Sequence, residues 1–88
     1  MKKILYSSIA KKNIQELDTN IKKRIKSKIE SLARGDVMGL FLRKPLQNYQ
    51  KLRVGIYRII FQEKDKNTIF VACIEHRGVV YKNMKERL

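Results

Sequence analysis

The apolar run at residues 69–74 constrains the fold of this chain more than any other feature. All six side chains, Ile-Phe-Val-Ala-Cys-Ile, are hydrophobic, and the run is rich in the β-branched and aromatic residues that favour strands. Because the run does not alternate with polar residues, we expect burial on both faces, as for a central strand under helices. The sequence therefore predicts a central strand from Thr68 to about Glu75.

Other strands are predicted on both sides of this run. Residues 52–54 and 57–62 carry Val, Ile and Tyr, and the polar residues 64–67 that follow suit a hairpin turn. Gly78 interrupts the chain, and residues 79–81 continue briefly as a strand before a basic tail. Residues 35–50 contain Gly, Asp, Pro and Asn, and we expect them to form a loop.

The first part of the chain predicts a short strand and two helices. Residues 3–6 suit a strand, Ser7 and Ser8 offer a break or a helix cap, and a helix follows from Ile9. Residues 18–20 offer the N-cap of a second helix, which Gly35 ends. Its apolar positions recur every three or four residues, at Ile21, Ile25, Ile29 and Leu32. Two helices with so short a connection are expected to pack as an antiparallel hairpin.

Together these elements predict an α+β fold in the order β-α-α-β-β-β. The N-terminal helical hairpin is expected to cover one face of a mainly antiparallel sheet and to leave the other face open. A chain of 88 residues fits one domain over residues 1–88 and leaves no room for a second. The longest apolar stretches are too short for a signal peptide or a membrane span, so we expect a cytoplasmic protein.

The charge of the chain indicates the class of partner. Twenty-one Lys and Arg residues against eight Asp and Glu residues give a net charge of +13. Such an excess favours binding to a polyanion through counterion release, and nucleic acid or the ribosome is the expected partner. An anionic membrane surface, an acidic protein partner or simply a solvated lysine-rich surface would also fit the charge alone.

The sequence argues against a protein-held metal. The chain has one cysteine, Cys73, and one histidine, His76, which cannot build a zinc site of the usual kind. The acidic residues are scattered, and most stand among lysines. Cys73 lies in the apolar run and is expected to be a buried hydrophobic residue. We therefore expect any catalysis to proceed without a metal or another cofactor.

The second half of the chain holds the side chains that suit RNA chemistry. Metal-free RNA cleavage needs a base for the 2′-OH, cations for the charged transition state and an acid for the 5′-oxygen. The predicted hairpin brings the start of one strand near the end of the next, so that Arg58 is expected to lie near His76, Arg77 and Tyr81. The whole candidate cluster is Lys51, Arg53, Arg58, His76, Arg77 and Tyr81. Each of these side chains also has a structural explanation, for instance a surface histidine or a core tyrosine.

Two sequence blocks resemble the RelE/ParE superfamily of toxins from toxin–antitoxin systems. The first is Leu-Arg-Val-Gly-Ile-Tyr-Arg-Ile-Ile-Phe at residues 52–61, and the second is Glu-His-Arg-Gly-Val-Val-Tyr at residues 75–81. The resemblance extends over essentially the whole chain. Glu75 and Ile56 depart from the residues that the family usually has there, which leaves the subfamily open.

The resemblance implies a ribosome-dependent endoribonuclease that cuts mRNA and that an acidic or amphipathic antitoxin neutralises. It implies that Lys51 is a base or charge stabiliser, that Arg58 holds the scissile phosphate and that Arg77 lies near the leaving group. It further implies that Tyr81 stacks on or orients the substrate. The remaining positions are Lys44 and Arg53, as contacts to rRNA or phosphate, and His76, as base or acid. Which of His76, Lys51 and Tyr81 is the base and which is the acid stays open.

Three alternatives share part of this evidence. The ParE branch has the same fold but inhibits DNA gyrase, and the retained Lys51, Arg58, His76, Arg77 and Tyr81 favour the RNase branch over it. A catalytically degenerate member would act as a binding or autoregulatory module with its antitoxin. An unrelated basic β-sheet protein that binds RNA would explain the charge but not the two blocks.

Overall fold

The computed structural model describes residues 1–76, with only the backbone of Glu75. The predicted strand at residues 79–81 and the candidate residues Arg77 and Tyr81 lie outside the described residues.

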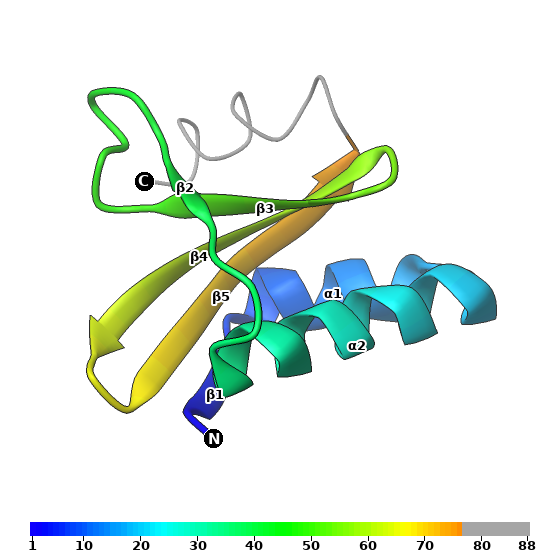
Figure 1. Ribbon diagram of the computed structural model, residues 1–88. Helices are drawn as coiled ribbons and strands as arrows, with labels where there is room; N and C mark the ends of the chain where they lie inside the picture. The colour runs from blue at the N-terminus through cyan, green and yellow to red at the C-terminus, as the bar shows by residue number, and fades with distance from the viewer. Residues whose placement is uncertain (77–88) are drawn as a thin grey trace.

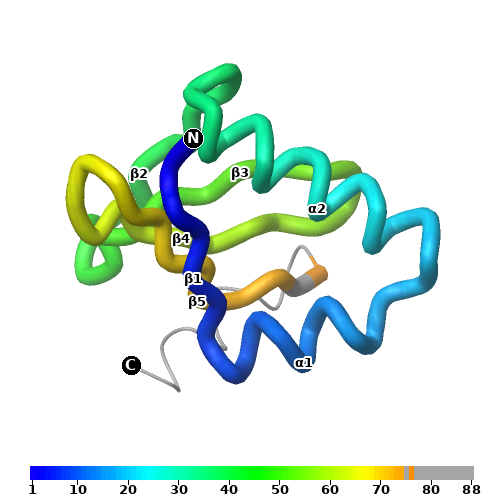
Figure 2. Tube along the Cα trace, turned by 90° about the horizontal axis from the view of Figure 1, so that it is seen from below, coloured from blue at the N-terminus to red at the C-terminus, as the bar shows by residue number. Residues whose placement is uncertain are grey.

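Within the described residues, five strands form one sheet, and two helices lie together on one face of it (Figures 1 and 2). The strand order is β1-β5-β4-β3-β2, with β1 parallel to β5 and every other neighbouring pair antiparallel. This architecture confirms the predicted α+β fold. The elements are β1 (Lys3–Tyr6), α1 (Ser8–Glu16), α2 (Thr19–Arg34), β2 (Leu40–Phe41), β3 (Gln50–Val54), β4 (Tyr57–Asp65) and β5 (Thr68–His76).

The ends of the helices are set by local side-chain chemistry. Ser7 precedes α1, and its hydroxyl accepts a hydrogen bond from the backbone N–H of Ala10 at 2.9 Å. Asp18 caps α2 in the same way, because its carboxylate accepts from the N–H of Ile21 at 3.0 Å. Gly35 ends α2 with a φ of 83°, a conformation that glycine adopts without a steric penalty. The predicted cap residues are confirmed.

The main core lies between the helices and the sheet. Ile25 and Ile29 of α2 are fully buried, and the strands meet them with Ile59, Phe61 and Val71, which are also inaccessible to solvent. Burial of such a set of aliphatic side chains supplies ~1.5–3 kcal/mol for each of them, which holds the helical hairpin on the sheet. The stripe of apolar residues predicted for α2 therefore forms the centre of the core.

The other face of the sheet carries a second, smaller core. Ile60 of β4 and Cys73 of β5 are buried there, and Leu42 and Leu46 from the segment between β2 and β3 cover them. The prediction that the helix-free face is open is therefore wrong where residues 42–49 cross it. The expectation that the apolar run is buried on both faces is confirmed, and so is the burial of Cys73.

The segment predicted as a loop contains one short strand. β2 pairs with β3 through Leu40 opposite Lys51 and Phe41 opposite Gln50, and it forms one edge of the sheet. Two residues without an alternating pattern give no strand signal in the sequence, so this element was missed. No helix among the described residues has both the length and the apolar character needed to cross a bilayer.

Candidate functional site

Two arginines stand directly opposite each other where β3 pairs with β4. The register aligns Arg53 with Arg58 and Lys51 with Ile60. Because Ile60 belongs to the core on the helix-free face, Lys51, Arg53 and Arg58 all project from that face. The register thus places two guanidinium-bearing residues side by side, and two such groups can donate hydrogen bonds to the same phosphate.

These three cations line one shallow hollow of about 260 Å³. We name it the arginine hollow, and its lining is Met38, Leu40, Lys51, Leu52, Arg53 and Arg58. Met38 and Leu40 are largely exposed, so the hollow presents apolar side chains beside its charges. Cations next to exposed apolar surface suit a nucleotide, which combines a phosphate with a base.

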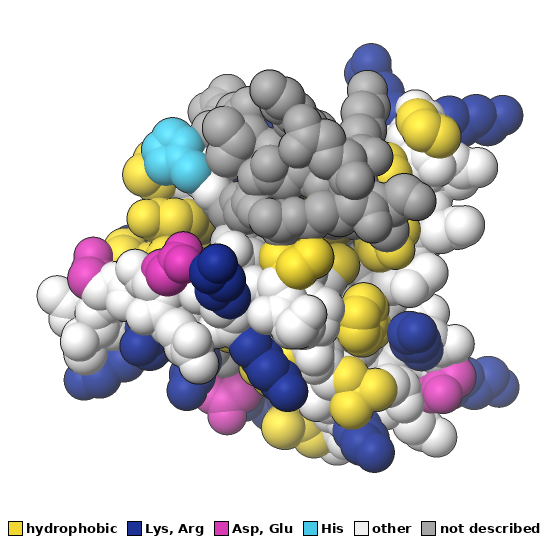
Figure 3. Space-filling model, turned by 180° about the vertical axis from the view of Figure 1, so that it is seen from behind, with side chains coloured by type: hydrophobic (Ala, Val, Ile, Leu, Met, Phe, Trp, Pro, Cys, Tyr) yellow, Lys and Arg dark blue, Asp and Glu magenta, His cyan; other side chains and the backbone are white. Residues whose placement is uncertain are grey.

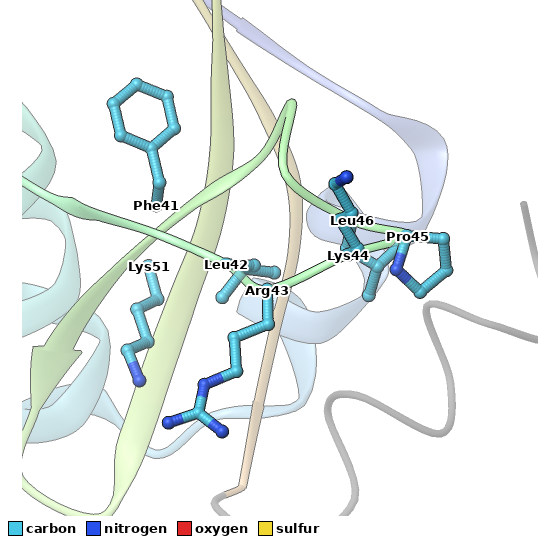
Figure 4. Close-up of a pocket in the computed structure, with 7 residues that line it drawn as sticks. All are labelled: Phe41, Leu42, Arg43, Lys44, Pro45, Leu46 and Lys51. Atoms are coloured by element: carbon cyan, nitrogen blue, oxygen red, sulfur yellow. The ribbon is translucent and has the colours of Figure 1, made fainter.

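Lys51 also lines a second, adjoining hollow of about 430 Å³. This loop hollow is formed by Phe41, Leu42, Arg43, Lys44, Pro45, Leu46 and Lys51. In Figure 4 the side chains of Arg43 and Lys51 extend in the same direction, whereas the ring of Phe41 points the opposite way. The structure therefore joins Lys44, which was predicted as an RNA contact, to the arginine hollow through Lys51.

Arg43 is a candidate that the sequence analysis missed. It is exposed and lines the loop hollow with Lys44. Its position beside Lys44 in a basic segment was the available signal. That signal was weak, because many Lys and Arg residues of this chain are simply surface residues. Figure 3 shows this spread, with Lys and Arg side chains on several separate parts of one face of the molecule.

His76 lies on the opposite face from the two arginines. The register pairs His76 with Tyr57 and Arg58 with Glu75, so the backbones of Arg58 and His76 lie close together, as expected. However, Tyr57 packs against the core under the helices, and the ring of His76 meets it edge-on with centroids 6.1 Å apart. The pleat of the strands thus separates His76 from Lys51, Arg53 and Arg58, which the sequence alone did not indicate.

Only part of the predicted cluster is therefore brought together by the described residues. Lys51, Arg53 and Arg58 share one hollow, Lys44 lies in the adjoining one, and His76 lies on the other face. Arg77 and Tyr81 lie outside the described residues. Among the described side chains, no three His, Cys, Asp or Glu residues are arranged to bind a metal ion.

This geometry can be compared with known proteins. The family model described as "ParE toxin of type II toxin-antitoxin system, parDE" matches residues 4–81. No curated protein matches the chain significantly.

Solved structures with the same fold include three toxins. The isolated E. coli RelE toxin superposes with a TM-score of 0.73 at 16% identity, covering 100% of both chains. A chain of the RelB–RelE antitoxin–toxin complex from Methanococcus jannaschii gives 0.68 at 28% identity, covering 90% of this chain and 96% of its own. The YoeB dimer from Staphylococcus aureus gives 0.71 at 22% identity, covering 86% and 97%.

Proposed function

Because the chain belongs to the ParE toxin family of type II toxin–antitoxin systems, we propose that it is a ribosome-dependent endoribonuclease that cleaves mRNA by metal-free acid–base catalysis. The observation that supports this proposal most directly is the arginine hollow. It sets Lys51, Arg53 and Arg58 on one face, with Arg53 and Arg58 directly opposed across two strands.

The chemistry of RNA cleavage explains why such a set is useful. The 2′-oxygen attacks the neighbouring phosphorus, the bond to the 5′-oxygen breaks, and negative charge builds up on the phosphate oxygens between these events. Guanidinium groups stabilise that charge through paired hydrogen bonds. In the proposed mechanism Arg58 holds the scissile phosphate, and Arg53 holds the same or the next phosphate.

The proton transfers need a base and an acid near that phosphate. Lys51 projects from the same face as both arginines, so we assign it as the base or as a further charge stabiliser. His76 lies on the other face of the sheet. It would act only on a substrate that reaches both faces by passing around the start of β4 and the end of β5, which pair with each other. For Arg77 and Tyr81 the roles implied by the family resemblance, near the leaving group and at the substrate base, remain part of the proposal.

The proposed partners follow from the family. The M. jannaschii structure is an antitoxin–toxin complex, and we propose a cognate antitoxin for this chain as well. Since the chain carries +13, that antitoxin is expected to be acidic or amphipathic. Translating ribosomes and mRNA in the cytoplasm are the proposed target.

The test is inducible expression in a bacterial host, followed by mapping of mRNA 5′ ends. We expect cuts within translated codons for the native chain and a cleavage rate roughly 10²–10³-fold lower for Arg58→Ala, the loss typical of removing one charge-stabilising donor. Arg34→Ala is the matched control, because this exposed arginine of α2 pairs with Asp36 outside the site. Full cleavage by Arg58→Ala would contradict the assigned site.

Inhibition of DNA gyrase is the second candidate function, because the matching family model is named for the ParE toxin. Under this alternative, growth arrest would be accompanied by an SOS response while mRNA stays intact. Measuring SOS induction and mRNA 5′ ends in the same cultures separates the two functions.

A further inference from the structure

A third basic hollow extends beyond the candidate site, between α2 and the turn that joins β3 to β4. Its volume is about 420 Å³. In the view from below, this turn lies beside α2 (Figure 2). We name it the helix hollow, and the side chains and backbone that form it include Lys23, Arg24, Ser27, Lys28, Arg53 and Gly55.

The turn brings its backbone close to the helix. Gly55 adopts a φ of 60°, and a Cβ built on it would lie 3.7 Å from one terminal nitrogen of Arg24. On the other side of the turn, the Nε of Arg53 donates a hydrogen bond to the carbonyl oxygen of Gly55 at 3.2 Å. Two guanidinium groups from distant parts of the sequence therefore lie near the same glycine.

Among the described residues that line the helix hollow, every charged side chain is positive. Arg24 and Lys28 are one helical turn apart, a spacing at which like charges destabilise a helix by ~0.2–0.5 kcal/mol. Among the side chains that the structure describes, the ion pairs are Lys2–Glu63 and Arg34–Asp36, and neither includes a cation of this hollow. The hollow thus gathers four cations without an acidic side chain in its lining.

We propose that the helix hollow binds a backbone phosphate of RNA and extends the RNA path beyond the arginine hollow. Arg53 lines both hollows. We therefore expect an RNA chain that is bound at Arg58 to continue past Arg53 to Arg24 and the lysines of α2. This continuity favours RNA over an acidic peptide. The Ser27 hydroxyl and the guanidinium groups also suit phosphate oxygens, which accept several hydrogen bonds at once. The inference rests on the proposed RNA-cleaving function for the identity of the polyanion.

The test compares two variants of equal net charge in the full chain. Lys23→Gln/Lys28→Gln removes two cations of the helix hollow, and glutamine preserves the helix. The control Lys12→Gln/Lys66→Gln removes two exposed lysines elsewhere, on α1 and in the turn between β4 and β5. The probe is a short fluorescent 2′-O-methyl oligoribonucleotide, which cannot be cleaved at a 2′-OH. Its affinity is measured by anisotropy over a series of NaCl concentrations.

We expect the slope of log affinity against log salt to fall in magnitude by about 0.7 for the helix-hollow variant relative to the control, the change for one phosphate contact on a single strand. Equal slopes for the two variants would overturn the proposal. Poly-glutamate serves as a second probe. If the helix-hollow variant weakens only poly-glutamate binding, the hollow is a site for an acidic peptide and the phosphate assignment is wrong.

The 5′-end mapping described above separates this inference from the proposed function. If the native chain cleaves no mRNA but the difference in slopes persists, the phosphate site stands and the endoribonuclease activity fails. If mRNA is cleaved but the slopes are equal, the activity stands and the phosphate site fails.

Discussion

At the scale of single residues, Gly39 shows how little room the fold leaves beside Lys51. A Cβ added at Gly39 would lie 2.5 Å from Cζ of the buried Phe61 ring and 3.0 Å from the backbone carbonyl oxygen of Lys51. We expect Gly39→Ala to lower the free energy of unfolding by about 1–3 kcal/mol, as overpacking does. We also expect it to lower RNA cleavage, because the strand that carries Lys51 must shift.

Gly35→Ala is the matched control for this prediction. Gly35 has a φ of 83°, so alanine there costs about 1–2 kcal/mol of stability, but nothing lies within 4 Å of an added Cβ. Urea unfolding and the cleavage assay are measured on both variants. If Gly39→Ala and Gly35→Ala reduce cleavage equally once both are fully folded, the proposed link between Gly39 and Lys51 is wrong.

Tyr6 gives the described part of the chain a pH dependence of stability. Burial, and then the negative charge of Glu30, raise the pKa of Tyr6 above its ordinary value of 10.0. The folded state therefore keeps the phenol proton at a pH where the unfolded chain loses it. The resulting stabilisation is complete below pH 10.0 and is lost as the pH rises through the raised pKa.

We therefore expect the free energy of unfolding of the native chain to fall more steeply above pH 10.0 than that of Tyr6→Phe, which cannot ionise. Glu30→Gln removes the smaller cause and is expected to reduce the steepness only in part. Denaturant unfolding at several alkaline pH values measures the difference. Parallel curves for the native chain and Tyr6→Phe would show that the environment of Tyr6 does not favour the protonated form.

The sequence predicts the role of a residue well where that role depends only on neighbouring residues of the chain. Ser7, Asp18 and Gly35 act within three or four residues of chain, so their roles as caps follow from local chemistry. The role of Gly39 depends on Phe61, which is distant in sequence, and no local pattern indicates it. The face on which His76 lies depends on strand register, which the sequence did not specify.

At the scale of elements, side chains of α1 and its cap form hydrogen bonds with the backbone of β5 where the pairing with β1 ends. β1 pairs with β5 only from Thr68 to Val71. Beyond that point, the hydroxyl of Ser7 donates a hydrogen bond to the carbonyl oxygen of Ala72, and Oδ1 of Asn13 accepts from the N–H of Ile74 at 2.9 Å. Two side chains at the start and in the middle of α1 thus replace a neighbouring strand and fix the end of β5 that leads to His76.

Removing the acceptor at Asn13 should loosen this end of the strand. Ile74 is buried, so Asn13→Ala leaves a buried N–H without a partner and is expected to cost about 1–3 kcal/mol. Asn13→Asp keeps an acceptor oxygen and should lose much less. Hydrogen exchange of the Ile74 amide measures the effect directly. Equal exchange rates in the alanine variant and the native chain would contradict a role for Asn13 in holding β5.

The elements that the sequence predicted are those with a long periodic or continuous apolar pattern. The stripe of α2 and the apolar run of β5 each span enough residues to fix their type and their burial. β2 has two residues, and residues 42–49 fold over the second core through the isolated Leu42 and Leu46. Such short segments take their structure from the strands they contact. The sequence therefore could not predict that residues 42–49 cover part of the helix-free face of the sheet.

At the scale of the whole molecule, the chain has a net charge of +13, and its folded body measures 31 × 31 × 22 Å. At ~0.01 M salt the screening length is about 30 Å, so charges across the whole molecule repel one another, whereas at ~0.15 M it is about 8 Å. We expect the Tm of the free protein to rise over this range of NaCl, because screening relieves repulsion that is stronger in the folded state than in the extended chain. Over the same range its affinity for RNA should fall, because counterions compete for the phosphates.

The two opposite trends test whether the excess positive charge serves binding to a polyanion at a cost in stability. The control is Lys12→Glu/Lys66→Glu, which reverses two exposed charges outside the three hollows and should flatten the rise in Tm while retaining most of the RNA affinity. A Tm that does not change with salt in the native chain would show that repulsion among these charges does not destabilise the fold, and the proposed cost in stability would be wrong.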